Sequence, residues 1–236
     1  MPVAQSRRPW APLLGATAIA MFILALAALA LLRVTDDPVT KGSGVLATET
    51  RHVPAFSAVR LSGVGDVVVH VGAPRSVAVR GDDNLLDRVT TDVHSDVLVV
   101  GLKDRVRTSS RLRVVVGVPT LDSLTLNGSG VLRATGVRAE RLHVDLAGSG
   151  VVHARGAVAR LDVVLDGVGD VQLGGLRAQA VDATLNGTGR VVVNPARSLD
   201  AVVNGAGEIV YRGTPARLRT TVTGLGVIVS EREAST

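Results

Sequence analysis

The sequence predicts an all-β fold: a right-handed parallel β-helix of about six or seven coils, preceded by one N-terminal transmembrane helix. Three observations point to it. A motif of the form small-Gly-any-Gly returns about every twenty residues through the C-terminal half, apolar and polar residues alternate on both sides of each copy, and one uninterrupted apolar segment lies near the N-terminus. The 236 residues are enough for one medium-sized domain plus an anchor.

The first expected element is a membrane anchor at residues 11–32, after a cytoplasmic tail at residues 1–10. The anchor segment carries no charge, and as a helix it would be about 33 Å long, close to the ~30 Å hydrocarbon core of a bilayer. Arg7 and Arg8 precede it, so the positive-inside rule places the N-terminus in the cytoplasm and the main domain outside. The lipid bilayer is therefore an expected partner, and the chain an expected single-pass protein of the cell membrane.

A cleaved secretory signal is the alternative for the same segment. Ala28, Leu29 and Ala30 have the small-any-small form of a cleavage site. The apolar run is longer than the roughly 7–15 residues usual in a signal peptide, which favours the anchor. If cleavage occurs, the main domain is secreted.

Residues 33–50 mix charged residues with Pro, Gly, Ser and Thr, which is typical of a linker, and the folded domain is expected to begin near Arg51. Residues 51–116 break the repeat period and are predicted to form an N-terminal β segment that caps one end of the solenoid, because solenoid ends leave unpaired strand edges. The strands expected there cover residues 66–71, 75–80, 97–102 and 111–116.

The repeat β-helix itself is predicted over residues 117–232. The first glycine of the motif recurs at Gly63, Gly128, Gly148, Gly167, Gly187, Gly205 and Gly224. From Gly128 onward the spacings are 20, 19, 20, 18 and 19 residues, whereas Gly63 stands 65 residues before Gly128. Because glycine tolerates positive φ and close backbone approach, we interpret these glycines as structural turn residues that let successive coils stack.

Alternating residues predict a strand on each side of the motif. The positions two and four residues before its first glycine, and four and six residues after it, are mostly Val, Leu, Ile or Ala, and the residues between them are mostly polar. This is the pattern of a strand that is buried on one side. Stacking three-faced coils of about twenty residues would give a continuous interior and parallel ladders about 4.8 Å apart. Parallel crossovers are right-handed in nearly all cases, which gives the expected hand.

The repeated tetrads, the segment GDDNLLDRV at residues 81–89 and the segment PTLDSLTLNGSG at residues 119–130 resemble the head GIN domain family, described as putative auto-transporter adhesins. The resemblance spans about residues 52–230. It implies a right-handed β-helix-like domain exported to the bacterial cell envelope, and it brings no established catalytic residues. Many relatives are lipoproteins attached through a Cys, whereas this chain has no Cys, so its attachment would rest on the apolar helix.

Candidates for site chemistry are few. There is no Cys, and none of the five His residues is paired at a spacing typical of metal ligands, so we predict no metal site and no cofactor. Asp162 and Asp182 occupy matching positions on neighbouring coils and could approach the separation of glycosidase carboxylates, but a sugar cleft usually has aromatic walls and this chain has few aromatic residues. We therefore expect no catalytic residue and no enzyme. Positive and negative charges nearly balance after residue 33, which argues against a nucleic-acid partner.

A candidate partner surface comes from the position five residues after the motif glycine. Val192, Val210 and Val229 occupy it in the last three coils, where earlier coils carry polar residues. If these valines face outward, they form an apolar stripe of the kind that marks partner surfaces. A covering segment or a shift of the strand pleat would instead bury them.

The same alignment predicts two polar ladders along the stack. Residues of alternating charge are expected to form one ladder: Asp170, Arg190 and Glu208. Stacked amide side chains are expected to stabilise the turns: Asn127, Asn186 and Asn204.

These features favour a membrane-anchored, non-catalytic module outside the cytoplasm that serves adhesion or partner binding at the cell envelope. The partner would be a protein or a glycan. A first alternative is an envelope regulatory or scaffolding protein that self-assembles, which would make the chain a homo-oligomer. A second alternative is an enzyme that acts on polysaccharides.

Overall fold

The computed structural model describes residues 39–104, 106–107 and 111–231, and one compact unit begins at Val39. The expected cytoplasmic tail at residues 1–10 and the expected anchor at residues 11–32 lie outside the described residues. Among the residues that are described, no helix is long and apolar enough to cross a bilayer.

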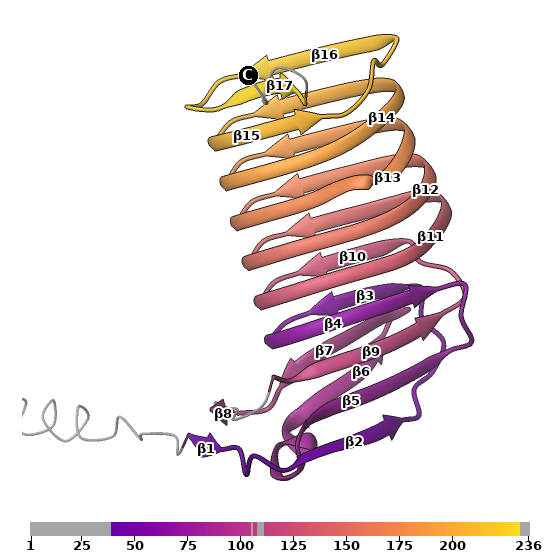
Figure 1. Cartoon of the computed structure of the whole chain (residues 1–236), viewed down its shortest axis with the longest axis vertical. Coiled ribbons are helices and arrows are strands. Elements are labelled where there is room, and N and C mark those ends of the chain that lie inside the picture. The colour runs from indigo at the N-terminus through magenta and orange to yellow at the C-terminus, as the bar shows by residue number, and fades with distance from the viewer. Residues whose placement is uncertain (1–38, 105, 108–110, 232–236) are drawn as a thin grey trace, which may run out of the picture. The chain divides into compact units, whose positions relative to one another are not determined.

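The unit is built almost wholly of β-strands (Figure 1). Its N-terminal elements are β1 (Thr40–Lys41), β2 (Leu46–Arg51), β3 (Ala58–Leu61), β4 (Val64–Val71), β5 (Ser76–Asp82), a 3₁₀ helix η1 (Asp83–Arg88), β6 (Val89–His94), β7 (Val97–Leu102), β8 (Val106–Arg107) and β9 (Arg113–Val118). Its C-terminal elements are β10 (Ser123–Leu126), β11 (Ser129–Leu146), β12 (Ser149–Leu165), β13 (Val168–Leu185), β14 (Thr188–Val203), β15 (Ala206–Tyr211), β16 (Arg217–Val222) and β17 (Val227–Ser230).

The strands from β10 to β17 stack as a solenoid. Each of β10 to β14 pairs in parallel with the strand that follows it, and β16 and β17 continue the ladders of β14 and β15. The predicted all-β solenoid with sequential parallel ladders is therefore confirmed. It has about five turns rather than the predicted six or seven. The prediction counted each glycine motif as a coil, but the first coil breaks off after β4 and the last, which follows Gly224, contains only the short strand β17.

Each full coil is one long strand. Along it, buried and exposed residues alternate within three short stretches. In β11 the inward residues are Leu132 and Ala134, then Val137, then Leu142, Val144 and Leu146. The alternation slips between runs, so the strand changes direction while its ladder pairing with β12 continues after one irregularity. The interior is filled by stacked Leu, Val and Ala side chains that are almost fully buried.

The coil has two unlike edges. We call the tight turns around the glycine motif the turn edge; it comprises residues 127–131, 147–151, 166–170, 186–190 and 204–208. We call the rounded side, where the first buried run ends and the last one begins, the bend edge (right in Figure 1); it comprises residues 135–141, 155–160, 174–180, 194–198 and 212–217. The bend segments have 7, 6, 7, 5 and 6 residues, and the coils that contain them have 20, 19, 20, 18 and 19. All of the variation in repeat length is therefore absorbed at the bend edge.

Glycine is required at the turn edge by the neighbouring coil. A Cβ atom built on Gly187 would lie 2.0 Å from the carbonyl oxygen of Gly167, and one on Gly167 would lie 2.0 Å from that of Gly148. The other predicted turn glycines, Gly128, Gly148, Gly205 and Gly224, have equally close backbone neighbours, at 1.9–2.2 Å. The second glycine of the motif adds a conformational reason, because φ is +144° at Gly189 and +145° at Gly169.

Gly63 also belongs to this stack, although the sequence sets it far apart. A Cβ atom on Gly128 would lie 1.9 Å from the Gly63 carbonyl oxygen, and β3 and β4 pair in parallel with β10 and β11. The solenoid thus takes in residues 58–71, which the sequence assigns to the cap. The glycine motif then lapses after β4 and returns after β10. In between, β7 pairs in parallel with β3 and β9 pairs in parallel with β4, so these two short strands extend the stack.

The excursion between β4 and β10 closes the N-terminal end of the solenoid. β5 pairs antiparallel with β9 and with β2, β6 pairs antiparallel with β7, and η1 buries Leu85 and Leu86. Strands lie in each of the four ranges predicted for this region. The folded unit starts earlier than expected near Arg51, because β2 lies in the predicted linker and completes the antiparallel sheet.

Candidate functional site

The valine stripe predicted as a partner surface is in register but is not exposed. Val192 stands between Gln172 and Val210 in the ladder, and Val210 pairs with Val229. Val192 and Val210 are 5% and 1% exposed, yet neither belongs to the interior cluster, and Val229 is half-buried. Val192 and Val210 are thus buried, as the alternative of a covered stripe allowed, and a role of the stripe in partner binding stays a prediction.

Two ion pairs flank these valines at strand positions on the same outward side. Arg190 and Glu208, two residues before Val192 and Val210, pair at 3.2 Å between Nε and Oε2. On the other flank Arg212 and Glu231 pair at 2.7 Å between Nη2 and Oε1. The aliphatic parts of such long side chains shield apolar neighbours from water. The predicted charge ladder is present at its Arg190–Glu208 step.

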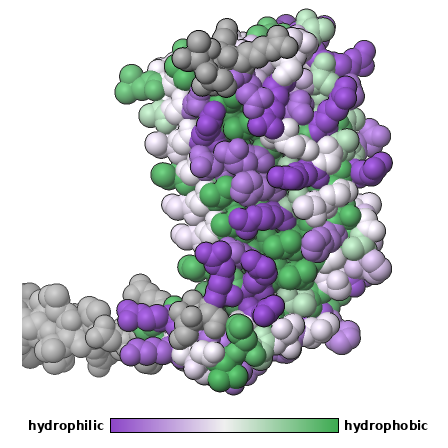
Figure 2. All heavy atoms as spheres, in the orientation of Figure 1, coloured by the Kyte–Doolittle hydropathy of each residue, from purple (hydrophilic) through white to green (hydrophobic). Residues whose placement is uncertain are grey.

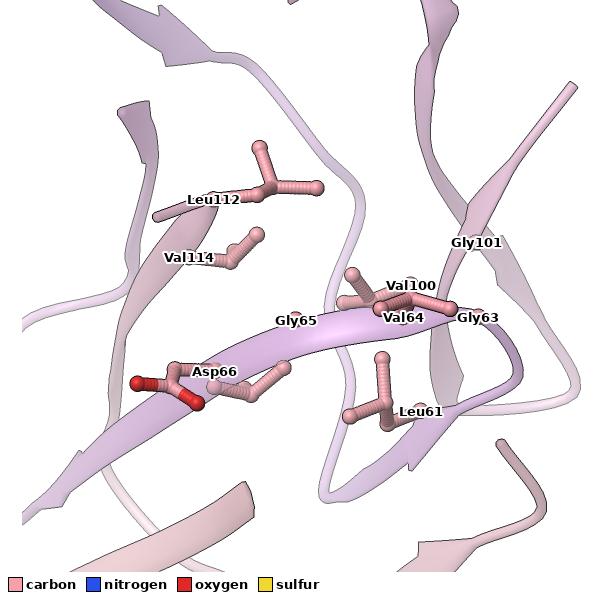
Figure 3. A pocket seen from close by; sticks show the side chains of 10 residues that line it. Leu61, Gly63, Val64, Gly65, Asp66, Val100, Gly101, Leu112 and Val114 are labelled. Atoms are coloured by element: carbon pink, nitrogen blue, oxygen red, sulfur yellow. The ribbon is translucent and has the colours of Figure 1, made fainter. Parts of the chain in front are cut away.

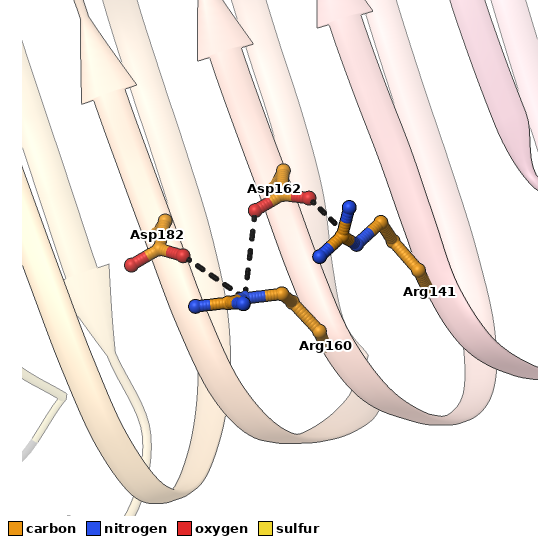
Figure 4. A network of polar contacts seen from close by, with 4 residues as sticks. All are labelled: Arg141, Arg160, Asp162 and Asp182. Atoms are coloured by element: carbon orange, nitrogen blue, oxygen red, sulfur yellow. Dashed lines mark ion pairs between the residues drawn. The ribbon is translucent and has the colours of Figure 1, made fainter.

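Asp162 and Asp182 pair in register on β12 and β13, as the sequence predicts, but arginines occupy the space around them. The Nε atom of Arg160 lies 3.3 Å from a carboxylate oxygen of Asp182 and 4.0 Å from one of Asp162, and Nε of Arg141 lies 3.6 Å from Asp162 (Figure 4). Both carboxylates thus face guanidinium groups rather than an open cleft. This is the geometry of a surface ion-pair ladder.

The turn edge carries a hydrogen-bonded ladder of polar side chains. Nδ2 of Asn186 donates to Oδ1 of Asp166 at 2.6 Å, Nδ2 of Asn204 donates to Oδ1 of Asn186 at 2.8 Å, and the Thr223 hydroxyl donates to Oδ1 of Asn204 at 2.6 Å. The ladder does not reach Asn127, because the intervening coil has Ala147 at that position. Each side chain in the ladder donates to the one on the preceding coil, so the ladder links successive turns and stabilises them.

One small cavity lies where the solenoid meets its cap (Figure 3). Leu61, Val100, Leu112 and Val114 line it together with glycine backbone atoms, and its volume is about 10 Å³. That is room for about one water molecule, and the lining is almost wholly apolar. It is too small and too apolar to be a ligand site.

Two outward groups titrate away from their ordinary values. Burial raises the pKa of Asp145, with His143 and Arg60 acting in the opposite direction and Asp166 adding to the rise. Burial, with Arg133 and Arg155 nearby, lowers the pKa of His153. Within the described part of the chain, no group of three or more His, Cys, Asp or Glu could hold a metal ion.

The bend edge carries the largest concentration of charge, which the sequence alone did not reveal. Its five segments contain eight arginines and one acid, Glu140. A shallow hollow of about 540 Å³ crosses three of its coils and is lined by Arg197 and Arg217 with Gln179, Ser198, Thr214 and alanines. The sequence does contain arginines in the segment of each repeat that varies in length. Only the stacked coils show that these segments lie side by side.

Comparison with known proteins gives a family for this fold. The family model described as "Putative auto-transporter adhesin, head GIN domain" matches residues 55–215. The chain belongs to this family. The resemblance noted from the glycine tetrads is thereby confirmed. No curated protein matches the chain.

Solved structures of bacterial proteins show a similar architecture. A putative adhesin from Bacteroides fragilis superposes with a TM-score of 0.70 at 25% identity, covering 80% of this chain and 99% of that one. A putative lipid binding protein from Parabacteroides distasonis superposes with a TM-score of 0.50 at 18% identity, covering 82% of this chain and 99% of that one. At that identity the second likeness shows the fold alone.

Proposed function

We propose that this head GIN domain protein is a non-catalytic module of the cell envelope that binds a partner through the exposed faces of its solenoid. The observation that carries the proposal is the stack itself. Each coil presents its outward side chains at a fixed register on the next coil, so a ligand meets rows of identical spacing rather than a single deep pocket. Figure 2 shows hydrophilic and apolar side chains interleaved over the visible face. The adhesin description of the family supports the same function.

The proposal includes attachment to the membrane through residues 11–32, with the solenoid outside the cytoplasm and its coils right-handed. The uninterrupted apolar composition of that segment supports attachment. If the anchor is retained, the chain stays in the membrane fraction after alkaline extraction and its N-terminus precedes residue 11. A soluble chain that begins shortly after Ala30 would instead establish cleavage and secretion.

Binding and turnover can be measured together. The full chain, held in a neutral detergent and coupled to beads, is presented to purified envelope polysaccharides and to intact cells, while the release of reducing ends is recorded. We expect saturable binding without release. A Gly187→Ala variant, whose added Cβ cannot be accommodated, controls for binding by an unfolded chain. Release of reducing ends by the intact chain would overturn the non-catalytic function.

A second candidate function, self-assembly, is favoured by the open C-terminal end. Leu218 and Val222 point toward the interior register of β14, yet they are 44% and 46% exposed because no further coil covers β16 in the described residues. Leu225 is 92% exposed. Such an end can pair with a second copy through its free strand edge.

Sedimentation velocity over a range of concentrations tests self-assembly. If it occurs, the chain forms larger species and Leu225→Asp abolishes them. Val64→Asp, which introduces the same charge at an exposed valine near the opposite end, leaves them unchanged. A monomer at every concentration would exclude this candidate. Val210 is unsuitable for the test, because it is buried.

A further inference from the structure

The two edges of the solenoid carry opposite charge. The five segments of the turn edge contain Asp166, Asp170 and Glu208 against Arg190. The five segments of the bend edge contain eight arginines against Glu140. The near balance of charge in the sequence therefore hides a separation between the two edges: the acids of the turn edge lie in two of its five segments, whereas every segment of the bend edge carries at least one arginine.

Acids neutralise only some of the bend-edge arginines. Arg141 and Arg160 pair with aspartates on the neighbouring face, and Arg212 pairs with Glu231. The remaining arginines have no acidic partner among the described residues, and each of five successive coils supplies one of them: Arg138, Arg155, Arg177, Arg197 and Arg217. All five are exposed. With coils about 4.8 Å apart, this row extends over about 19 Å.

The surface between these arginines suits a hydrated polar chain. The hollow beside Arg197 and Arg217 also contains neutral hydrogen-bonding side chains: Gln179, Ser198 and Thr214. The alanines that line the rest of it have short side chains, which leave the space open. A glycine also makes room for an arginine on this edge. A Cβ atom on Gly175 would lie 2.9 Å from Cγ of Arg155, so the arginine side chain lies across that glycine. The hollow has no aromatic residue on which a base could stack and no large apolar residue that could enter a lipid layer.

We propose that the bend edge binds a linear acidic polysaccharide, a ligand class that rests on the proposed binding function and specifies it. Guanidinium groups form paired hydrogen bonds with carboxylates and sulfates, and hydroxyl groups of the sugars can reach the neutral side chains of the hollow. A polymer engages several coils at once, so weak single contacts add to a useful affinity. A monomeric uronic acid binds far more weakly than the polymer.

Matched charge-reversal variants of the full chain test this assignment. The first carries Arg177→Glu, Arg197→Glu and Arg217→Glu on the bend edge. The control carries Arg75→Glu, Arg80→Glu and Arg107→Glu, which are exposed arginines of the N-terminal part without an acidic partner among the described residues. Both sets change the net charge equally. Polygalacturonate is the probe, neutral dextran the reference, and binding is measured by interferometry with circular dichroism as the check on folding.

We expect the bend-edge variant to bind polygalacturonate at least about tenfold more weakly than the parent, and the control variant to stay within about twofold of it. Dextran should not bind, and salt should weaken the polymer binding because the contacts are exposed. Equal losses in both variants would show attraction by net charge alone and would overturn the assignment. Stronger binding to vesicles of phosphatidylglycerol, or to single-stranded DNA, would overturn the ligand class.

The outcomes also separate this inference from the proposed function. If cell or envelope binding persists in the bend-edge variant while polygalacturonate binding is absent in the parent, the proposed function holds and the bend-edge assignment fails. If the folded parent binds neither cells nor any polymer, both fail.

Discussion

The turn edge and the bend edge of this solenoid obey opposite rules. At the turn edge the backbones of successive coils lie so close that a Cβ atom added to a motif glycine would stand about 2 Å from a carbonyl oxygen. Only glycine fits at those positions. At the bend edge the segment length varies from 5 to 7 residues, the ladder register shifts, and arginine, alanine, glutamine, proline and glycine all occur. Stacking is therefore fixed at one edge, and the other is left open to carry a recognition surface.

The largest expected effect comes from the same substitution on the two edges. Gly187→Ala places a Cβ atom 2.0 Å from the backbone oxygen of Gly167, and we expect it to lower the free energy of unfolding by more than about 3 kcal/mol. Gly175→Ala places its Cβ atom 2.9 Å from a side-chain carbon of Arg155, which can rotate away, so we expect less than about 1 kcal/mol. Urea unfolding followed by far-ultraviolet circular dichroism measures both changes.

The pair is informative because the chemistry of the two substitutions is identical. Neither glycine has a positive φ that would add strain of its own. Comparable losses in the two variants would contradict the claim that only the turn edge is sterically fixed.

A smaller effect is expected from the polar ladder on the turn edge. Asn186→Ala removes a hydrogen bond to Asp166 and another from Asn204, and we expect a loss of about 1–2 kcal/mol in the free energy of unfolding. Asn127→Ala is the matched control, since no neighbour extends the ladder to it and Ala147 occupies the next coil. If both variants lost the same stability, the turn itself rather than the ladder would be responsible.

The fold was largely predictable because its periodicity is local. The spacing of Gly128, Gly148 and Gly167 and the alternation around each glycine are properties of adjacent residues, and stacking is the only way to bury the resulting apolar sides. The place of Gly63 was not predictable, because the 65 residues between it and Gly128 form a segment of mixed parallel and antiparallel strands that interrupts the repeat. Its pairing with β10 and β11 depends on tertiary contacts, not on the repeat.

The candidate site was much less predictable than the fold. Val192 and Val210 were placed correctly in the ladder, but their burial was not predictable, because it depends on tertiary packing; one ion pair beside them joins residues 19 apart in the chain. Arg177 and Arg197 each follow the first motif glycine by 10 residues, but Arg217 follows it by 12 and Arg155 by 7, so the spacing alone does not align the five arginines. Only the stacked coils show that they form one strip.

On the bend side, the arginine–aspartate ladder should contribute little to stability. Arg160 pairs with Asp162 and Asp182, but the three side chains are 50%, 31% and 48% exposed. We expect Arg160→Met to cost less than about 1 kcal/mol in thermal or urea unfolding and the difference to disappear in about 1 M salt. Arg138→Met, which breaks no ion pair among the described residues, is the control. A larger loss that survives high salt would show that this edge, too, contributes to holding the coils together.

The smallest expected effect is a pH dependence at Asp145, on the face between the two edges. Burial raises its pKa, and Oδ1 has no hydrogen-bond partner among the described residues. Between the ordinary pKa and the raised one, the folded chain binds more protons than the unfolded chain, so this group makes the fold less stable as pH rises through that window.

Asp145→Asn removes this unfavourable charge. Its melting temperature should therefore exceed that of the parent near neutral pH, and the gap should close as the pH falls below about 3, where the parent carboxyl group is protonated in both states. Differential scanning calorimetry of both proteins across this range measures the gap. A gap that widens on acidification would mean that the carboxylate stabilises the folded chain through Arg60 and His143, and that the face between the edges is held by charge rather than by the packing beneath it.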